Sequence, residues 1–414
     1  MLTAVVCADR VWDGLAPKPI PHGFVAVEHG LITAVGRQGD LGSRFDGAHR
    51  LDLSGVTLLP GLINGHVHLT FSASSAPVED YLADASIGLC ALTLRAVANL
   101  EAAARVGVTT VRDLGTLNDV AFAVREAAAS GRITSPRVIS SGEPLTVTGG
   151  HCHWFSHQCD TPAEIRRAVR RQASAGADLV KIFATGGNLT PRTNPFAPQF
   201  TSEELRACVE EATRLGLPVA AHAHAPEGIR RAVAAGASTI EHCFFETATG
   251  VEYDPAVAEA MAAAQVAFCP TLGARLCRVL AESEPASPTL RRILGKLPAI
   301  VKAMRNLVDA GVPLLAGSDA GVTNHPFGDF PADVGALVVD DMLGFTPHQA
   351  LMAATSGAAA ILGLTDTGVL AAGRRADLLA VAGDPLSDIA DLTRTRYVMQ
   401  GGTPLALSPM ASAA

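Results

Sequence analysis

Residues 61–69 read Gly61-Leu62-Ile63-Asn64-Gly65-His66-Val67-His68-Leu69 and follow the apolar run 56–59. Successive side chains of a strand point to opposite faces, so two histidines separated by one residue share a face. His66 and His68 would therefore present two ring nitrogens from one strand end, and imidazole nitrogen is a common ligand of zinc and related metals. An isolated His-x-His pair also occurs in ordinary cores and surfaces. A metal site therefore requires further ligands from elsewhere in the chain.

Composition places the chain among globular proteins that bury a core, since 48% of its 414 residues are hydrophobic and 17% are charged. A net charge of −8 argues against a nucleic-acid partner. The first residues carry no signal-peptide pattern, and no run of about 18 apolar residues predicts a membrane span. Eight cysteines without Cys-x-x-Cys spacing are typical of reduced core thiols. We therefore expect a cytoplasmic protein that binds neither nucleic acid nor membranes.

Short apolar runs alternate with Ala-rich helical segments along the middle of the chain. Thr161 and Thr201 are each followed three residues later by a glutamate, which is a helix-start signal, and Gly176 and Gly236 follow helical segments as stop signals. The predicted strands are 56–59, 108–113, 137–140, 178–184, 218–222, 238–242, 266–270 and 313–317. The predicted helices are 84–105, 118–129, 162–174, 202–215, 226–235, 256–264 and 298–310. This alternation predicts an α/β fold, a (β/α)8 TIM barrel.

Both ends of the chain contain strand-like segments outside this alternation. These include a hairpin expected at His29-Gly30 and the runs 375–381 and 395–402 near the C-terminus. We expect residues 1–58 and 364–414 to form one small β-sandwich domain, and residues 59–363 to form the barrel domain. Two unrelated decorations at the edges of the barrel are the alternative that periodicity leaves open.

Side chains that can bind a metal or a proton stand at the ends of five predicted strands. In a barrel of parallel strands these ends meet on one face, where such enzymes carry their chemistry. Each has an ordinary explanation alone: Lys181 could be paired with a carboxylate, His242 could be a core histidine, and Asp319 could cap a helix. Their recurrence at five strand ends favours one shared metal site. The residues are His66, His68, Lys181, His222, His224, His242 and Asp319.

In order and spacing these positions resemble the amidohydrolase superfamily across residues 56–383. The resemblance also rests on Pro60-Gly61-Leu62-Ile63 before the histidine pair, the run 180–187 around Lys181, and Ile240-Glu241-His242. Among subgroups the chain is most similar to the prolidase-like metallopeptidases and the ochratoxinase-type amidases, with imidazolonepropionase-like enzymes as further relatives. The histidine pair alone is moderately specific, whereas the five-position set is highly specific.

The resemblance implies a binuclear metal-dependent amidohydrolase with two divalent ions, of which zinc is the expected metal. The ligands of the first ion would be His66, His68 and Asp319, and those of the second would be His222 and His242. Lys181 would bridge the ions as a carbamate formed with CO2, because an ammonium group cannot bind a cation. Apolar neighbours lower the pKa of a buried lysine, and the neutral amine is the form that reacts with CO2.

The same resemblance implies that a metal-bridging hydroxide attacks the carbonyl carbon of the substrate. Asp319 would act as a catalytic base and return the proton to the leaving nitrogen. His224 would help to polarise the carbonyl oxygen, with a solvent-facing position as the alternative. The candidate substrate contacts, all on loops after predicted strands, are His151, His153, Arg192 and His325.

The favoured substrate is a dipeptide, an N-acyl amino acid or a related small amide. A deaminase or a cyclic amide or urea hydrolase of the same superfamily is the alternative. A non-catalytic barrel scaffold is disfavoured, because such proteins usually lack the metal ligands that are present here.

Asn64 departs from the superfamily pattern, in which Asp often stands two residues before the first histidine. A neutral Asn would orient a ligand histidine more weakly. It resembles the mononuclear deaminase branch, but Lys181 favours the binuclear hydrolase. Finally, the apolar residues 334–339 predict an exposed helix through which the chain could form a homo-oligomer.

Overall fold

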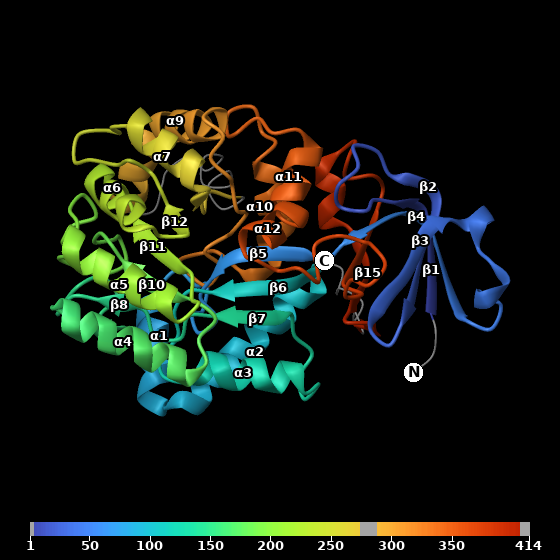
Figure 1. Ribbon diagram of the computed structural model, residues 1–414, viewed down its shortest axis with the longest axis horizontal. Helices are drawn as coiled ribbons and strands as arrows, with labels where there is room; N and C mark the ends of the chain where they lie inside the picture. Colours follow the sequence, from blue (N-terminus) through green and yellow to red (C-terminus); the bar gives the residue numbers. More distant parts are fainter. Residues whose placement is uncertain (1–3, 274–287, 406–414) are drawn as a thin grey trace.

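The computed structural model describes residues 4–273 and 288–405. Figure 1 shows a twisted β-sheet at one end of the molecule and a larger α/β part at the other. The sheet combines both ends of the chain in the order β16-β15-β14-β4-β1-β2-β3. Its strands are β1 (Ala4–Val11), β2 (Ile20–Glu28), β3 (Leu31–Arg37), β4 (His49–Pro60), β14 (Leu378–Ala382), β15 (Thr395–Gln400) and β16 (Thr403–Pro404).

The predicted association of the two chain ends is confirmed, and the strands form one mixed sheet. β1 and β4 are parallel, whereas β4 and β14 pair antiparallel with Leu379 opposite Leu59. The predicted hairpin joins β2 to β3, and both His29 and Gly30 have positive φ, as a tight two-residue turn requires. The division of the chain at residues 58/59 and 363/364 stays a prediction.

The larger part contains parallel strands in two sheets. One sheet has the order β5-β6-β7, and the other has the order β13-β12-β11-β10-β8-β9. The strands of the first sheet are β5 (Leu62–Val67), β6 (Val108–Asp113) and β7 (Arg137–Ser140). Those of the second are β8 (Leu145–Thr146), β9 (His157–Gln158), β10 (Val180–Phe183), β11 (Val219–Ala223), β12 (Thr239–His242) and β13 (Ala267–Cys269).

Two of the predicted barrel strands differ from the structure. The run 56–59 belongs to β4 of the terminal sheet, and the strand that carries His66 is β5, which begins after Gly61. Residues 313–317 form no regular strand but still lie between the two sheets. The backbone N–H of Leu315 donates to Phe268 of β13 at 2.9 Å, and that of Gly65 in β5 donates to Ala316 at 2.9 Å. This segment therefore takes the place of the expected eighth strand.

Helices surround these strands (Figure 1). The predicted cap at Thr161 is present, and Thr201 and Glu204 form a capping box. The α-helices are α1 (Pro77–Ile87), α2 (Leu89–Arg105), α3 (Val120–Ala129), α4 (Pro162–Ala175), α5 (Ser202–Arg214), α6 (Pro226–Ala235), α7 (Pro255–Ala264), α9 (Pro288–Asp309), α10 (Phe330–Ala336), α11 (Pro347–Ala353) and α12 (Ser356–Ile361). Short 3-10 helices are η1 (Gln38–Asp40), η2 (Ser43–Phe45), η3 (Phe327–Asp329) and η4 (Ile389–Thr393).

The segment expected to mediate self-association is largely buried within the chain. Val334 and Leu337 are buried, and Val339 is the large apolar side chain of this segment that is exposed. The expectation of an exposed apolar helix at 334–339 is therefore wrong, because α10 packs this face inward. A homo-oligomer stays a prediction without support from this helix.

The cysteines of the described residues are free thiols. They are buried as predicted, except that Cys90 is exposed. Cys277 lies outside the described residues. None of the helices within 4–273 and 288–405 combines the length and apolarity that a membrane crossing needs.

Candidate metal centre

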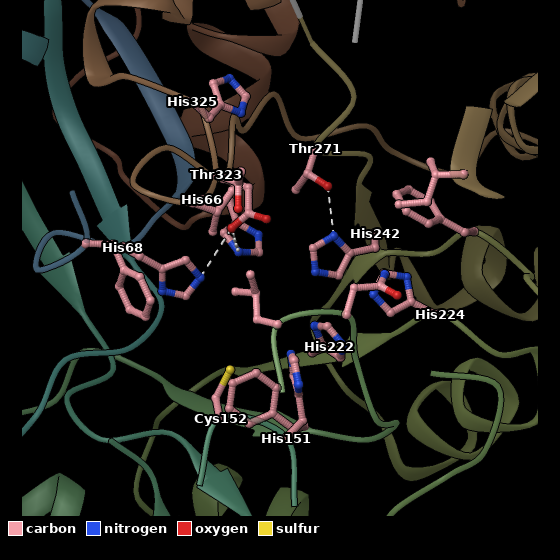
Figure 2. A pocket seen from close by; sticks show the side chains of 18 of the residues that line it. His66, His68, His151, Cys152, His222, His224, His242, Thr271, Thr323 and His325 are labelled. Carbon is pink, nitrogen blue, oxygen red and sulfur yellow. Dashed lines mark hydrogen bonds and ion pairs between the residues drawn. The ribbon is translucent and has the colours of Figure 1, made fainter. Parts of the chain in front are cut away.

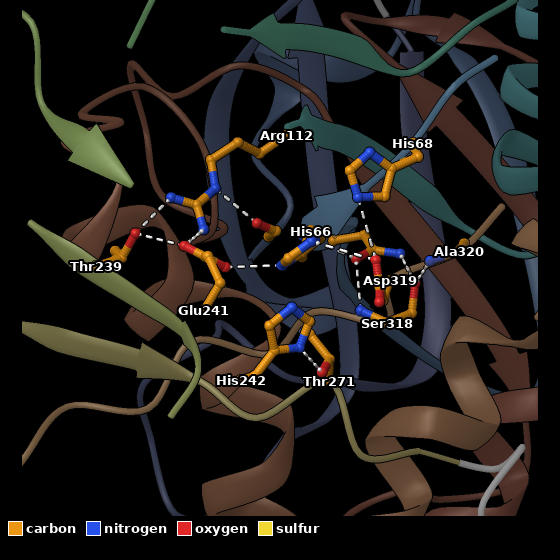
Figure 3. Close-up of polar contacts among 12 residues, drawn as sticks. His66, His68, Arg112, Thr239, Glu241, His242, Thr271, Ser318, Asp319 and Ala320 are labelled. Carbon is orange, nitrogen blue, oxygen red and sulfur yellow. Dashed lines mark hydrogen bonds and ion pairs between the residues drawn. The ribbon is translucent and has the colours of Figure 1, made fainter. Parts of the chain in front are cut away.

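Three predicted ligands meet where β5 faces the turn after residue 317 (Figure 3). His66 lies in β5, and His68 follows the last residue of that strand. Nε2 of each histidine lies 3.3 Å from Oδ1 of Asp319. All three side chains are largely withdrawn from solvent, with 19% of the Asp319 side chain exposed. We refer to His66, His68 and Asp319 as the first ligand group.

Asp319 is held in this position by its backbone. Its φ of 61° lies in the left-handed region, which non-glycine residues seldom adopt. Its N–H donates to the carbonyl oxygen of His66 at 2.8 Å, which fixes the turn against β5. Burial by itself would raise the pKa of Asp319, but His66 and His68 together bring that pKa well below its ordinary value. The side chain is therefore a carboxylate at neutral pH.

The contact between His66 and Glu241 determines which ring nitrogen of His66 can bind a metal ion. Nδ1 of His66 lies 2.8 Å from Oε2 of Glu241, and an ionised carboxylate only accepts hydrogen bonds, so Nδ1 carries the proton. In the form of the ring that binds a metal ion, Nε2 carries no proton, and its lone pair faces Oδ1 of Asp319 at 3.3 Å. Among the described residues neither atom has a hydrogen-bond partner. In that form Nε2 and Oδ1 are two buried acceptors that face each other, and a positive charge between them would stabilise both, so these residues fit a divalent metal ion.

A second ligand group comes from β11 and β12 and consists of His222, His224 and His242 (Figure 2). Their ring centroids lie 4.7, 4.6 and 4.6 Å apart. Nε2 of His222 lies 3.2 Å from the carbonyl oxygen of Gly186, and Nδ1 of His242 lies 2.8 Å from Oγ1 of Thr271. These contacts leave the opposite nitrogen of each ring for a ligand. Thr271 is a contact that the sequence prediction does not include.

Burial keeps the second ligand group neutral. Loss of solvent is the main cause that lowers the pKa of His222 and His242 well below 6.5 and that of His224 to about 3. A neutral imidazole has the lone pair that a metal ion requires. The structure thus places His224, predicted to contact the substrate, together with the two predicted metal ligands.

Lys181 lies in β10 and is almost completely buried. Loss of solvent lowers its pKa to about 8, although the carboxylates of Glu241 and Asp319 oppose this shift. At pH 7 roughly one lysine in ten would then hold a neutral amine, far more than for an exposed lysine. The charge of Lys181 in turn lowers the pKa of His222 and His242 of the second ligand group, and the carboxylate of Asp319 in the first ligand group raises the pKa of Lys181, so this side chain interacts electrostatically with both ligand groups.

Two buried charged residues of the site are missing from the sequence prediction. Glu241 in β12 accepts hydrogen bonds from Nη2 of Arg112 at 2.8 Å and from Oγ1 of Thr239 at 2.6 Å. Burial by itself would raise the pKa of Glu241, but Arg112 and His66 bring it below its ordinary value. The sequence contains one signal for this pair: Arg112 and Glu241 each lie inside an apolar run, 108–113 and 239–242. A charged residue in a buried strand needs a partner of opposite charge, so the two could have been predicted to pair.

A cavity of about 370 Å³ opens onto both ligand groups (Figure 2). This volume is in the range of small-molecule sites. The described residues that line it include both ligand groups, Lys181 and an apolar set formed by Phe71, Phe155, Phe183, Phe244, Leu272 and Ile293. A small organic substrate with apolar parts therefore fits the cavity better than an extended polar chain does.

The predicted substrate contacts divide into two pairs. His151 and His325 line the cavity, and the ring centroid of His151 lies 4.9 Å from that of His222. His153 and Arg192 are not among its described lining residues. The chain turns at Cys152 with a φ of 55°, and Nδ1 of His153 lies 3.1 Å from the carbonyl oxygen of Gly150, whereas Arg192 is exposed. The structure thus gives no support to substrate contacts by His153 and Arg192.

The sequence model of the Amidohydrolase family matches residues 57–405 of the chain. The chain belongs to the amidohydrolase family. It is accordingly a hydrolase that acts on carbon–nitrogen bonds, as the resemblance implied. Members of this family generally use divalent metal ions, which agrees with the two ligand groups of this amidohydrolase.

Several known proteins are similar to this amidohydrolase over most of their length. Ochratoxinase from Aspergillus niger is 28% identical over 424 aligned positions, which cover 93% of this chain and 83% of the relative. The crystal structure of A. niger ochratoxinase has a TM-score of 0.84 at 25% identity and coverages of 97% and 95%.

A Xaa-Pro dipeptidase crystallised with methionine in its active site has the same TM-score of 0.84 at 28% identity, with coverages of 97% and 99%. Imidazolonepropionase from Deinococcus deserti is 29% identical over 378 positions and covers 85% of each chain. These similarities confirm the predicted superfamily and the predicted TIM-barrel fold class, although the parallel strands hydrogen-bond as two sheets.

Proposed function

We propose that this amidohydrolase uses two divalent metal ions, with zinc as the expected metal, to hydrolyse an amide bond in a dipeptide, an N-acyl amino acid or a related small amide. The observation that carries the proposal is the presence of two buried ligand groups at one end of the parallel strands, both of which open onto one cavity. One ion would need only one such group, so the second group supports a binuclear centre.

Lys181 would complete both coordination shells as a carbamate. The pKa of about 8 makes its amine available for reaction with CO2 near neutral pH. The product is an anion with two oxygens, so it can bind one ion on each side, which an ammonium group cannot do. His66, His68 and Asp319 would hold the first ion, and His222 and His242 would hold the second.

When bound, the ions supply Lewis acidity that polarises the substrate carbonyl and makes water a better nucleophile. The chain itself supplies the proton transfers. Asp319 is ionised at neutral pH, so one of its carboxylate oxygens can accept the proton of the attacking water. The same carboxyl group would then donate this proton to the amide nitrogen, which must be protonated before it leaves.

His224 would orient the carbonyl group of the substrate. Its ring is buried and neutral, and its Nδ1 has no hydrogen-bond partner among the described residues. In the tautomer that carries its proton on Nδ1, the ring could donate a hydrogen bond to the carbonyl oxygen as negative charge develops there. In the other tautomer Nδ1 has a lone pair, and His224 would instead be a third ligand of the second metal ion.

The comparisons support the substrate class. A similar protein is named as a Xaa-Pro dipeptidase and another as an ochratoxinase. The aromatic wall of the cavity suits a side chain with a ring or a branched aliphatic group next to the scissile amide. The similarity to imidazolonepropionase keeps a cyclic amide hydrolase as the second candidate.

A screen of the zinc-loaded protein tests this proposal. Xaa-Pro and other dipeptides, N-acyl amino acids, lactams and amino-substituted heterocycles would be assayed in parallel for free amine and for ammonia. We expect release of a free amine from a linear amide and about two metal ions per chain by elemental analysis. Ammonia from a heterocycle without cleavage of any linear amide would favour a deaminase. Full activity of a metal-free preparation would refute the binuclear proposal.

A further inference from the structure

The side of His66 that faces away from Asp319 carries another set of potential ligands. His66, Glu241 and Cys269 each offer one atom, and these atoms lie within 4.8 Å of one another in the buried interior. Gly317 permits this approach, since a Cβ at that position would lie only 2.5 Å from Sγ of Cys269 and 2.8 Å from Cβ of His66. We call these three residues the rear ligand set. It shares His66 with the first ligand group and therefore competes with it.

Imidazole, carboxylate and thiolate together form a ligand set that zinc and cobalt ions accept. Burial keeps the free side chain of Cys269 a thiol, so an ion bound there would have to displace the thiol proton. The resulting thiolate would be the softest ligand near the centre, so the rear ligand set is chemically attractive to such ions. Something in the structure must therefore favour the front side of His66, where the cavity lies and the substrate can enter.

Arg112 occupies the rear side (Figure 3). This residue of β6 is buried and donates three hydrogen bonds through its planar guanidinium group. They reach the carbonyl oxygen of Gly65 at 2.6 Å, Oγ1 of Thr239 at 3.0 Å and Oε1 of Glu241 at 2.8 Å. The other carboxylate oxygen of Glu241 faces Nδ1 of His66 at 2.8 Å. Both oxygens of Glu241 are thus already bound.

We propose that Arg112 is a positioning residue that decides which face of His66 binds the metal ion. By binding Glu241, Arg112 keeps this carboxylate from joining Cys269 as a metal ligand. Glu241 then stays hydrogen-bonded to Nδ1 of His66, so this ring can bind a metal ion only through Nε2. A cation in the rear ligand set would also meet the positive charge of Arg112, which cannot lose its proton. The inference rests on the metal-binding part of the proposed function.

Removal of the guanidinium group has two consequences in this scheme. Glu241 becomes an uncompensated carboxylate beside Cys269, so the rear ligand set can bind a cation. The first ligand group then loses affinity, by about 10- to 100-fold if Arg112 has the effect typical of residues that orient a metal ligand. The two consequences have different spectroscopic signatures, since only the rear ligand set contains sulfur.

The test compares cobalt-loaded wild-type protein with Arg112→Met, Arg112→Lys and the double variant Arg112→Met, Cys269→Ser. Thiolate-to-cobalt charge transfer is read from near-ultraviolet absorption, and the affinity for each ion is read from competition with a chelator. We expect no thiolate band in the wild type or in Arg112→Lys, a band in Arg112→Met, and its loss in the double variant. Arg137→Met is the matched control, because Arg137 forms a bidentate ion pair with Asp366, which belongs neither to the two ligand groups nor to the rear ligand set, and it should give no band.

Two results would overturn the inference. One is a thiolate band in the wild type, and the other is an Arg112→Met variant that binds both ions with wild-type affinity and shows no band. Should Arg112→Met fail to fold, Glu241→Gln is the second test. A glutamine whose oxygen still accepts the hydrogen bond of Arg112 directs its NH2 group toward Nδ1 of His66. Nδ1 must then be the acceptor, and Nε2 carries the proton and cannot bind a metal ion. Weaker binding of one ion in Glu241→Gln supports the inference, and unchanged binding overturns it. A wild type that binds no metal would instead refute the proposed function.

Discussion

Asn64 binds Ser318 through both ends of its amide group. Nδ2 donates to Oγ of Ser318 at 2.7 Å, and Oδ1 accepts the backbone N–H of Ser318 at 3.1 Å. The same Oδ1 lies 3.3 Å from the backbone nitrogen of His66 and accepts its N–H. The residue that departs from the superfamily pattern therefore joins the strand that carries His66 to the turn that carries Asp319. It acts on the backbone of the first ligand group.

Substitution of Asn64 tests this role. Asn64→Ala leaves the buried backbone N–H groups of His66 and Ser318 without this acceptor, which should lower the free energy of unfolding by about 1–3 kcal/mol. Equilibrium denaturation of the metal-loaded protein measures the change. Asn64→Asp is the control, since it keeps an acceptor oxygen at the same place and should lose much less stability. Equal stability of Asn64→Ala and the wild type would contradict the structural role.

The lowered pKa of Lys181 predicts how metal loading depends on pH. The amine reacts with CO2 and the ammonium form does not, so reactivation of the metal-free enzyme by zinc at constant dissolved CO2 should accelerate as pH rises. The increase should level off above about 8, because most Lys181 side chains are neutral there. An unperturbed lysine would continue to gain reactivity up to its ordinary pKa near 10.4.

Lys181→Ala provides the control for this measurement. It should bind less metal and lose activity, and short carboxylic acids should restore part of both by replacing the carbamate. Carbon-13 NMR of protein loaded with labelled CO2 reports the carbamate directly. Reactivation of Lys181→Ala with the same CO2 dependence as the wild type would remove Lys181 from the scheme.

Much of the centre can be predicted from the sequence because its ligands follow local rules. The spacing of His66 and His68 places both on one face of a strand, and parallel strands bring the ends of distant segments to one face of a barrel. His222, His242 and Asp319 follow from the same rule. The structure brings all of these residues together at one cavity.

The boundary between β4 and β5 could not be predicted, because both strands are apolar and their partners lie far away in the sequence. The run 56–60 pairs with residues of β14 near the C-terminus, whereas Leu62 begins a strand that pairs with β6. Gly61 separates them, and a Cβ there would lie 2.2 Å from Thr109. The contact between Arg112 and Glu241 is equally non-local, so neither charge reveals its partner in the sequence.

Substitution of Asp319 tests its proposed place in the chemistry. Asp319→Asn keeps the shape of the side chain and one potential ligand oxygen but cannot accept a proton from water. We expect the turnover number to fall by about 10²- to 10⁴-fold, the range for general acid–base catalysis, while most of the metal stays bound. Steady-state kinetics and elemental analysis of the same preparation measure both quantities. Near-normal turnover would exclude Asp319 as the base.

Metal removal should lower thermal stability as well as activity. The first ligand group would hold an ion between the Nε2 atoms of His66 and His68 and the carboxylate of Asp319, so removal of the ion takes a positive charge away from these buried groups. Ions that bind only the folded state raise its stability by mass action, by about 2.7 kcal/mol at 100 times the dissociation constant. Thermal unfolding with increasing zinc should therefore show a rising midpoint. Calcium, which prefers six or more oxygen ligands, is the control ion and should have little effect.

The last prediction compares residues that line the cavity with residues on the neighbouring loops outside it as contacts for the substrate. His151→Ala and His325→Ala remove side chains that line the cavity, so we expect a higher KM for the best substrate found in the screen. His153→Ala and Arg192→Ala are the matched controls, since their side chains lie on the same loops as cavity residues but do not line the cavity themselves. Their kcat/KM should stay close to that of the wild type.

The position of His325 makes this comparison informative. Its Nε2 lies 3.0 Å from Oδ2 of Asp333, so one edge of the ring is held by α10 while the ring borders the cavity. A ring fixed in this way can contact substrate at little cost in side-chain entropy. A large loss of kcat/KM in His153→Ala or Arg192→Ala, with none in His151→Ala or His325→Ala, would show that substrate binds outside this cavity.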